Sequence, residues 1–148
     1  MMRLLLMIVS ITFSFSQVRP YAEPYGLKYN NLDLNENIIS VDGEIFINYM
    51  QEAAPSALPS GVLYRLTLTF DGFKKGFLSI QDWHVPEGSS LFIFNSLDSY
   101  TGPYLSKDGD SFFSGRFASD RLILEYFEPI NAAFNGNFII NKLEEDFT

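Results

Sequence analysis

Three aspartates in predicted loops are the residues best suited to holding a metal ion. Asp98, Asp108 and Asp110 lie between predicted strands, in loops that could meet at one end of a β-rich domain. Carboxylate oxygens are hard ligands of the kind that calcium takes. The spacing from Asp108 to Asp110 lacks the rest of an EF-hand loop, and ordinary acidic turns have the same composition. Two interpretations therefore stand, a structural calcium site and solvated turns.

Aromatic residues beside the loops are the second candidate for ligand binding. Trp83, Tyr100 and Tyr104 lie in or next to predicted loops. Exposed aromatic rings form platforms for sugars in carbohydrate-binding β-proteins, whereas buried ones fill the core. These three residues are thus a candidate platform for a glycan, with core packing as the alternative.

One short string resembles the surroundings of a catalytic serine. Gly109-Asp110-Ser111 matches the opening of the Gly-Asp-Ser-Gly-Gly string around the nucleophile of trypsin-like proteases, but Phe112 and Phe113 replace the two glycines. Those glycines let the backbone approach the substrate and shape the oxyanion site. We therefore expect Ser111 to lie in an ordinary turn.

Other reactive residues are sparse. His84 is the single histidine and the chain has no cysteine, which argues against a zinc or redox-metal site. Glu125 and Glu128 are three residues apart, so a strand would place them on opposite faces, unlike a paired acid and base. We predict no catalytic residue in this chain alone.

The charge balance limits the classes of partner. The chain has 18 acidic and 10 basic residues, a formal net charge of −8. A nucleic-acid backbone is bound by clustered Lys and Arg, and only Lys74 and Lys75 are adjacent. We expect no nucleic-acid partner.

The first 16 residues have the layout of a signal peptide. Arg3 precedes an apolar run over residues 4–13, and Ser14 and Ser16 follow it. The run is shorter than the roughly 18 residues that a membrane span needs, and no later run is apolar enough. We predict cleavage after Ser16 and a secreted protein, extracellular or at the cell surface, with the periplasm as a further location.

The pattern of apolar residues and turn signals divides the remaining chain into two parts. Residues 17–60 are expected to be an N-terminal segment with a hairpin turning at Asp42-Gly43 and an extended linker over 53–60. Residues 61–148 are expected to form one domain, beginning with an alternating strand over 61–70 that turns at Asp71-Gly72. Turn signals recur about every 8–12 residues, as in sandwiches and jelly rolls. Further strands are predicted at 77–80, 90–95, 112–117, 122–127 and 137–143.

These features predict an all-β protein, an antiparallel β-sandwich of jelly-roll or CUB-like type. From Gly61 onward several strings also resemble one family. They are residues 64–68 (YRLTL), 86–95 (PEGSSLFIFN), 102–104 (GPY), 114–117 (SGRF), 122–129 (LILEYFEP) and 136–140 (GNFII). Together they resemble the β-sandwich module that precedes the catalytic domain in secreted bacterial lysyl-endopeptidase-like, trypsin-type serine proteases.

The resemblance implies a non-catalytic module that assists the folding, latency or substrate contact of a serine protease domain. No protease triad accompanies it, and the chain ends at Thr148. Two contexts stay open, the front fragment of a longer chain and a free-standing relative of the module. The alternative function is an independent adhesion or carbohydrate-binding module, whose partner would be a surface glycan or a protein.

Overall fold

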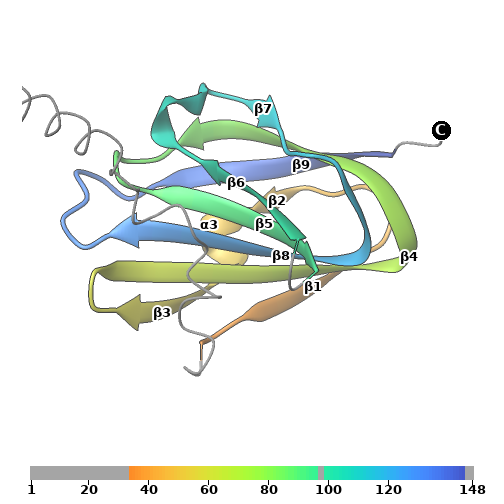
Figure 1. Ribbon diagram of the computed structural model, residues 1–148, viewed down its shortest axis with the longest axis horizontal. Helices are drawn as coiled ribbons and strands as arrows, with labels where there is room; N and C mark the ends of the chain where they lie inside the picture. The colour runs from red at the N-terminus through yellow and green to blue at the C-terminus, as the bar shows by residue number, and fades with distance from the viewer. Residues whose placement is uncertain (1–33, 97–98, 146–148) are drawn as a thin grey trace, which may run out of the picture.

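The computed structural model describes residues 34–96 and 99–145, and the predicted signal peptide lies outside them. Within this part of the chain nine strands join in one hydrogen-bonded sheet (Figure 1). The elements are β1 (Asn37–Val41), β2 (Ile47–Asn48), α3 (Tyr49–Glu52), β3 (Ala54–Leu58), β4 (Gly61–His84), β5 (Ser90–Ser96), β6 (Ser99–Tyr104), η2 (Ser106–Asp108), β7 (Phe112–Phe113), β8 (Phe117–Pro129) and β9 (Asn137–Glu145). No helix in the described residues is long and apolar enough to span a membrane.

The sheet is built around β4, which runs for 24 residues and bends back on itself (Figure 1). Its first half pairs with β8 and its second half with β9, in the order β2-β9-β4-β8-β5-β6. The turn expected at Asp71-Gly72 is instead an exposed bulge within this strand. Thr69 and Lys74, on either side of the bulge, both pair with β8, so the chain bends without leaving the sheet.

The residues before β4 belong to the same sheet. β3 pairs antiparallel with the start of β4, and β1 pairs parallel with residues 66–70. Residues 54–58 were expected to be part of a linker, but Ala54, Ser56 and Leu58 are buried alternately, which is the period of a strand. β2 pairs with β9, so no hairpin joins it to β1.

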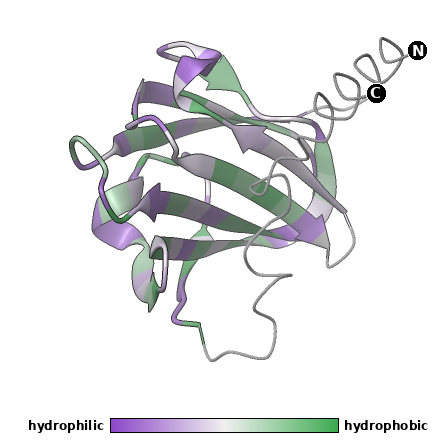
Figure 2. Cartoon of the chain, turned by 60° about the vertical axis from the view of Figure 1, so that its left-hand side comes forward, coloured by the Kyte–Doolittle hydropathy of each residue, from purple (hydrophilic) through white to green (hydrophobic). Residues whose placement is uncertain are grey.

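The expected antiparallel β class is confirmed, with β1 as the parallel exception. All strands connect into one open sheet, so the pairing itself does not show the two packed sheets of a sandwich. Apolar and polar residues alternate along the strands (Figure 2). Aromatic rings fill the centre of the core, where Tyr49 stacks on Phe138 at 4.5 Å between ring centroids and Trp83 packs against Phe138 at 4.9 Å.

Candidate functional site

Two of the three predicted platform residues lie within the packing of the sheet. Trp83 is only 4% exposed, and its Nε1 donates a hydrogen bond of 2.9 Å to the carbonyl of Leu105. Phe112 contacts both aromatic residues, edge-to-face with Trp83 at 5.1 Å and stacked on Tyr104 at 5.0 Å. The Tyr104 hydroxyl accepts a hydrogen bond of 2.7 Å from the Gly115 amide. Trp83 and Tyr104 thus fasten the η2 loop to the sheet.

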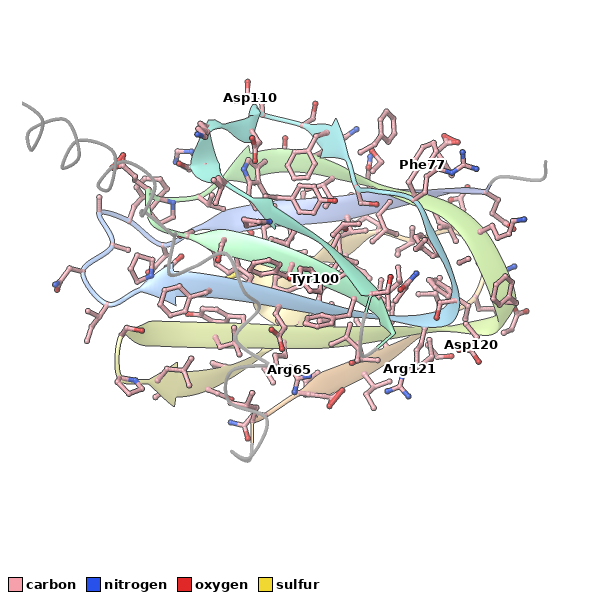
Figure 3. All side chains as sticks on the ribbon, viewed as in Figure 1. Arg65, Phe77, Tyr100, Asp110, Asp120 and Arg121 are labelled. Atoms are coloured by element: carbon pink, nitrogen blue, oxygen red, sulfur yellow. The ribbon has the colours of Figure 1, made fainter. Side chains whose placement is uncertain are left out.

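The third platform residue, Tyr100, lies on the edge strand β6, well separated from Asp110 at the top of Figure 3. Its side chain is 38% exposed. Phe92 and Phe94 contact its ring, at centroid distances of 5.6 and 5.7 Å. Tyr100 is therefore an aromatic ring supported by two neighbouring rings and partly exposed to solvent.

Two of the three aspartates predicted as calcium ligands make structural contacts, Asp108 through its side chain and Asp110 through its backbone. Asp98 lies outside the described residues. Asp108 Oδ2 accepts a hydrogen bond of 2.6 Å from the Leu105 amide, which closes η2, and the carbonyl of Asp110 accepts one of 2.9 Å from the Trp83 amide. Over residues 34–96 and 99–145, no three side chains of His, Cys, Asp or Glu gather in a group that could hold a metal.

A pocket of about 370 Å³ lies beside this loop, between the turn that precedes β5 and the 3-10 turn η2. We call it the turn pocket. Its lining residues are Glu87, Gly88, Ser89, Leu105, Ser106 and Lys107. The sequence pointed to the loop around Asp108 but not to the opposite wall at residues 87–89. Contact between the two turns arises only from the folding of the sheet.

A buried hydrogen-bonded network extends from the turn pocket into the sheet. The Ser89 and Tyr126 hydroxyls are 3.1 Å apart, and the Tyr126 hydroxyl donates to Glu128 Oε1 at 2.9 Å. The same carboxylate oxygen accepts a hydrogen bond of 2.6 Å from the Gly136 amide. Tyr126 has one hydroxyl proton and donates it to the carboxylate. Its oxygen can therefore only accept a hydrogen bond from the Ser89 hydroxyl.

The network does not activate Ser89 as a nucleophile. Burial is the main factor that raises the pKa of Tyr126 well above the ordinary tyrosine value, with the hydrogen bond to Glu128 adding to it. A phenol in that state is no general base at neutral pH. His84, the one histidine, is stacked on Phe134 at 4.4 Å. Ser111 is exposed in the loop before β7. Ser89 lines the turn pocket, and its hydroxyl is held by Tyr126.

The two glutamates of β8 occupy opposite faces, and both are buried. Glu125 Oε2 lies 3.1 Å from Arg65 Nε on β4, an ion-pair distance without the alignment of a hydrogen bond. The Tyr49 hydroxyl is nearby, donating to the carbonyl of Tyr64 at 2.6 Å. Burial first, and then the charge of Glu125, raise the pKa of Tyr49. The sequence signal for the Arg65–Glu125 contact and for the Tyr126–Glu128 network is a glutamate inside the otherwise apolar strand β8.

The buried tyrosines predict how stability depends on alkaline pH. Burial raises the pKa of Tyr49 and Tyr126 in the folded protein, whereas in the unfolded chain it is about 10. The folded state therefore holds protons that the unfolded state releases, and the free energy of unfolding falls as pH rises above about 10. In a spectrophotometric titration, phenolate absorbance from these two residues should appear together with unfolding. Reversible ionisation of all tyrosines with the fold intact would contradict this.

Comparison of the chain with protein-family models gives no match, and no curated protein is similar to it in sequence.

Proposed function

We propose that this chain is a non-catalytic binding module that acts beside a serine protease domain. The protease domain would belong to the same chain or to a longer chain that contains this one. One observation carries the proposal. The residues that build the turn pocket network fall within the strings that resemble the protease-associated module: Ser89 in 86–95, Tyr126 and Glu128 in 122–129, and Gly136 in 136–140. Three of the six resembling strings thus supply the residues of the buried network beside the pocket.

The network gives the pocket a defined chemistry. Ser89 lines the pocket but is only 1% exposed, so its bond to Tyr126 fixes the pocket wall and the exposed side chains would supply the contacts with a ligand. Glu87 and Lys107, both exposed, add one acceptor and one donor to the lining. A polypeptide segment carries donors and acceptors in alternation, which fits this lining. Contact with a protease substrate or with the protease domain is the role that we propose. The strands bonded to the two halves of β4 would form the two layers of the implied β-sandwich.

The pocket is tested with the purified chain and an unfolded, protease-sensitive polypeptide such as reduced casein. We expect NMR chemical-shift changes at residues 87–89 and 105–107. Lys107→Gln should weaken binding about fivefold or more, as expected for the loss of a charge-assisted hydrogen bond. Arg121→Gln is the matched control, since Arg121 is exposed on β8 and does not line this pocket. Equal weakening in both variants would contradict the pocket.

The protease context has its own test. A reading frame that continues past Thr148 into a protease domain with His, Asp and Ser would support it, and a stop codon there would remove the link. Cleavage of a Lys-X peptide by the purified chain, abolished by Ser111→Ala, would overturn the non-catalytic assignment.

A second candidate function, glycan binding, is favoured by Tyr100. Its partly exposed ring is supported by Phe92 and Phe94, which suits stacking on a sugar. This candidate needs no protease partner.

A further inference from the structure

The loop between β8 and β9, which projects from one end of the sheet in Figure 1, contains a reactive amide. Asn135-Gly136 is the only Asn-Gly pair in the chain, and it lies directly before β9. The backbone nitrogen that follows an asparagine can attack the side-chain carbonyl, and a glycine leaves that nitrogen unhindered because it has no side chain. Asn135 is also exposed to solvent. Its local sequence therefore makes Asn135 the asparagine most disposed to deamidation.

Deamidation at this pair needs no reactant other than water. First, the Gly136 nitrogen loses its proton and forms a bond to Asn135 Cγ, while the bond from Cγ to Nδ2 breaks and the amide leaves as ammonia. Water then opens the resulting succinimide ring, which gives aspartate or isoaspartate. In isoaspartate the main chain runs through Cβ and Cγ and is one methylene longer.

The fold holds the nitrogen that would attack. Gly136 is buried, and its N–H donates a hydrogen bond of 2.6 Å to Glu128 Oε1, which also accepts from the Tyr126 hydroxyl at 2.9 Å. An added Cβ at Gly136 would overlap that hydroxyl, so the Gly136 backbone is packed directly against Tyr126. A hydrogen bond to a carboxylate favours the protonated form of its donor, and burial keeps hydroxide away. Both effects oppose the first step of deamidation.

The same hydrogen bond is one of two anchors on either side of Asn135. Phe134 is stacked on His84 at 4.4 Å between ring centroids, and Gly136 is bonded to Glu128. An additional methylene between Phe134 and Gly136 lengthens the main chain between these anchors. At least one of them must then be displaced, and the bond to Glu128 is the one next to the change.

We propose that Asn135 is a deamidation site that the network around Glu128 holds inactive, and that its conversion to isoaspartate releases Gly136 from that network. Tyr126 and Ser89 belong to the same network, and Ser89 lines the turn pocket. The modification therefore loosens one wall of the pocket. The modification site itself does not depend on the proposed binding function, whereas its effect on polypeptide binding rests on it.

The first test measures the protection that the fold gives. The purified chain is incubated at mildly alkaline pH, and deamidation at Asn135 is followed by mass spectrometry of proteolytic fragments. A synthetic peptide of residues 132–138 gives the rate without the fold. We expect the folded chain to react at least about tenfold more slowly than the peptide, because the nitrogen is released only by local opening. Equal rates would overturn the proposal.

The second test removes the acceptor. Glu128→Met keeps much of the side-chain volume and should deamidate at Asn135 about tenfold faster than the wild type, the loss expected for a hydrogen bond to a charged group. If this variant does not fold, Glu128→Gln takes its place, with an acceleration of about fivefold because a neutral acceptor holds the amide less strongly. A wild-type rate in the variant that folds would contradict the proposal, and a slower rate would show that the carboxylate promotes the reaction.

Arg65→Met is the matched control for stability. It removes the cation beside Glu125 and leaves the hydrogen bonds of Glu128 in place. Its rate of deamidation should stay well below that of the Glu128 variant. Equal acceleration in the two variants would show that global unfolding sets the rate, and the account of the network would be wrong.

The third test separates the longer main chain from the new charge. The isoaspartate form is purified by ion exchange and compared with Asn135→Asp, which has the same charge and an ordinary main chain. We expect amide hydrogen exchange at Gly136 to be about tenfold faster in the isoaspartate form than in Asn135→Asp. Equal exchange would exclude the release of Gly136. Reduced casein should also bind the isoaspartate form more weakly, and failure of this result alone would count against the binding function and not against the modification.

Discussion

Replacement of Arg65 by methionine is expected to lower the free energy of unfolding by about 3 kcal/mol. Glu125 is almost wholly buried, and its carboxylate lies 3.1 Å from Arg65 Nε. Methionine keeps much of the side-chain volume, so the main effect is a buried carboxylate without its cation. The guanidinium is partly exposed, which places the expected loss at the lower end of the range for buried pairs. Urea denaturation of the wild type and the variant measures the difference.

The double variant Arg65→Met, Glu125→Leu separates charge from packing. Removing both charges should recover much of the stability, because an apolar pair of similar volume avoids the cost of burying ions. The double variant should then unfold at a urea concentration close to that of the wild type. If Arg65→Met alone unfolds like the wild type, the contact between Arg65 and Glu125 contributes nothing and the prediction is wrong.

Substitution of Gly136 by alanine is the second change with a large expected effect. An added Cβ would overlap the Tyr126 hydroxyl and lie 3.0 Å from Glu128 Oε1. The Glu128 carboxylate also accepts a hydrogen bond from the Gly136 amide. Relieving the clash would therefore move Tyr126 or Glu128 and break at least one of these hydrogen bonds. We expect a loss of about 3 kcal/mol, the upper part of the range for overpacked interiors.

The matched control for this substitution is Gly72→Ala in the bulge of β4. A Cβ at Gly72 would meet no atom within 4 Å, and the residue is exposed. The free energy of unfolding of the Gly72→Ala variant should therefore stay within about 0.5 kcal/mol of the wild-type value. Equal stability of Gly136→Ala and Gly72→Ala would contradict the account of the network around Glu128.

The central strands could be predicted from local sequence because their signals agree. Residues 90–95, 122–127 and 137–143 fall within β5, β8 and β9, where apolar β-branched and aromatic residues lie between turn signals. The bend of β4 could not be predicted in the same way. Asp71-Gly72 is a common turn pair, but it equally suits a bulge, and only pairing with β8 on both sides decides between them.

The candidate sites were partly visible in the sequence. The loop with Asp108 does form one wall of the turn pocket, and Tyr100 does stay partly exposed. Trp83 looked like a loop residue because it shortly precedes Val85-Pro86, yet it lies near the end of β4 and its ring packs against Phe138. The hollow lined by Lys75, Asn95 and Ala118 joins residues of β4, β5 and β8, so no local spacing could reveal it.

The length of β4 also has a consequence for the order in which the protein folds. Its partners extend from β1, which begins at Asn37, to β9, which ends at Glu145. Pairings between residues so far apart close slowly, because the loop entropy is lost before the contacts form. During synthesis, Leu66 and Leu68 of β4 stay without their β8 neighbours until residues 122–124 have been made. While residues 69–124 are being made, the nascent chain therefore carries an apolar strand without its β8 partner, a state that is prone to aggregation.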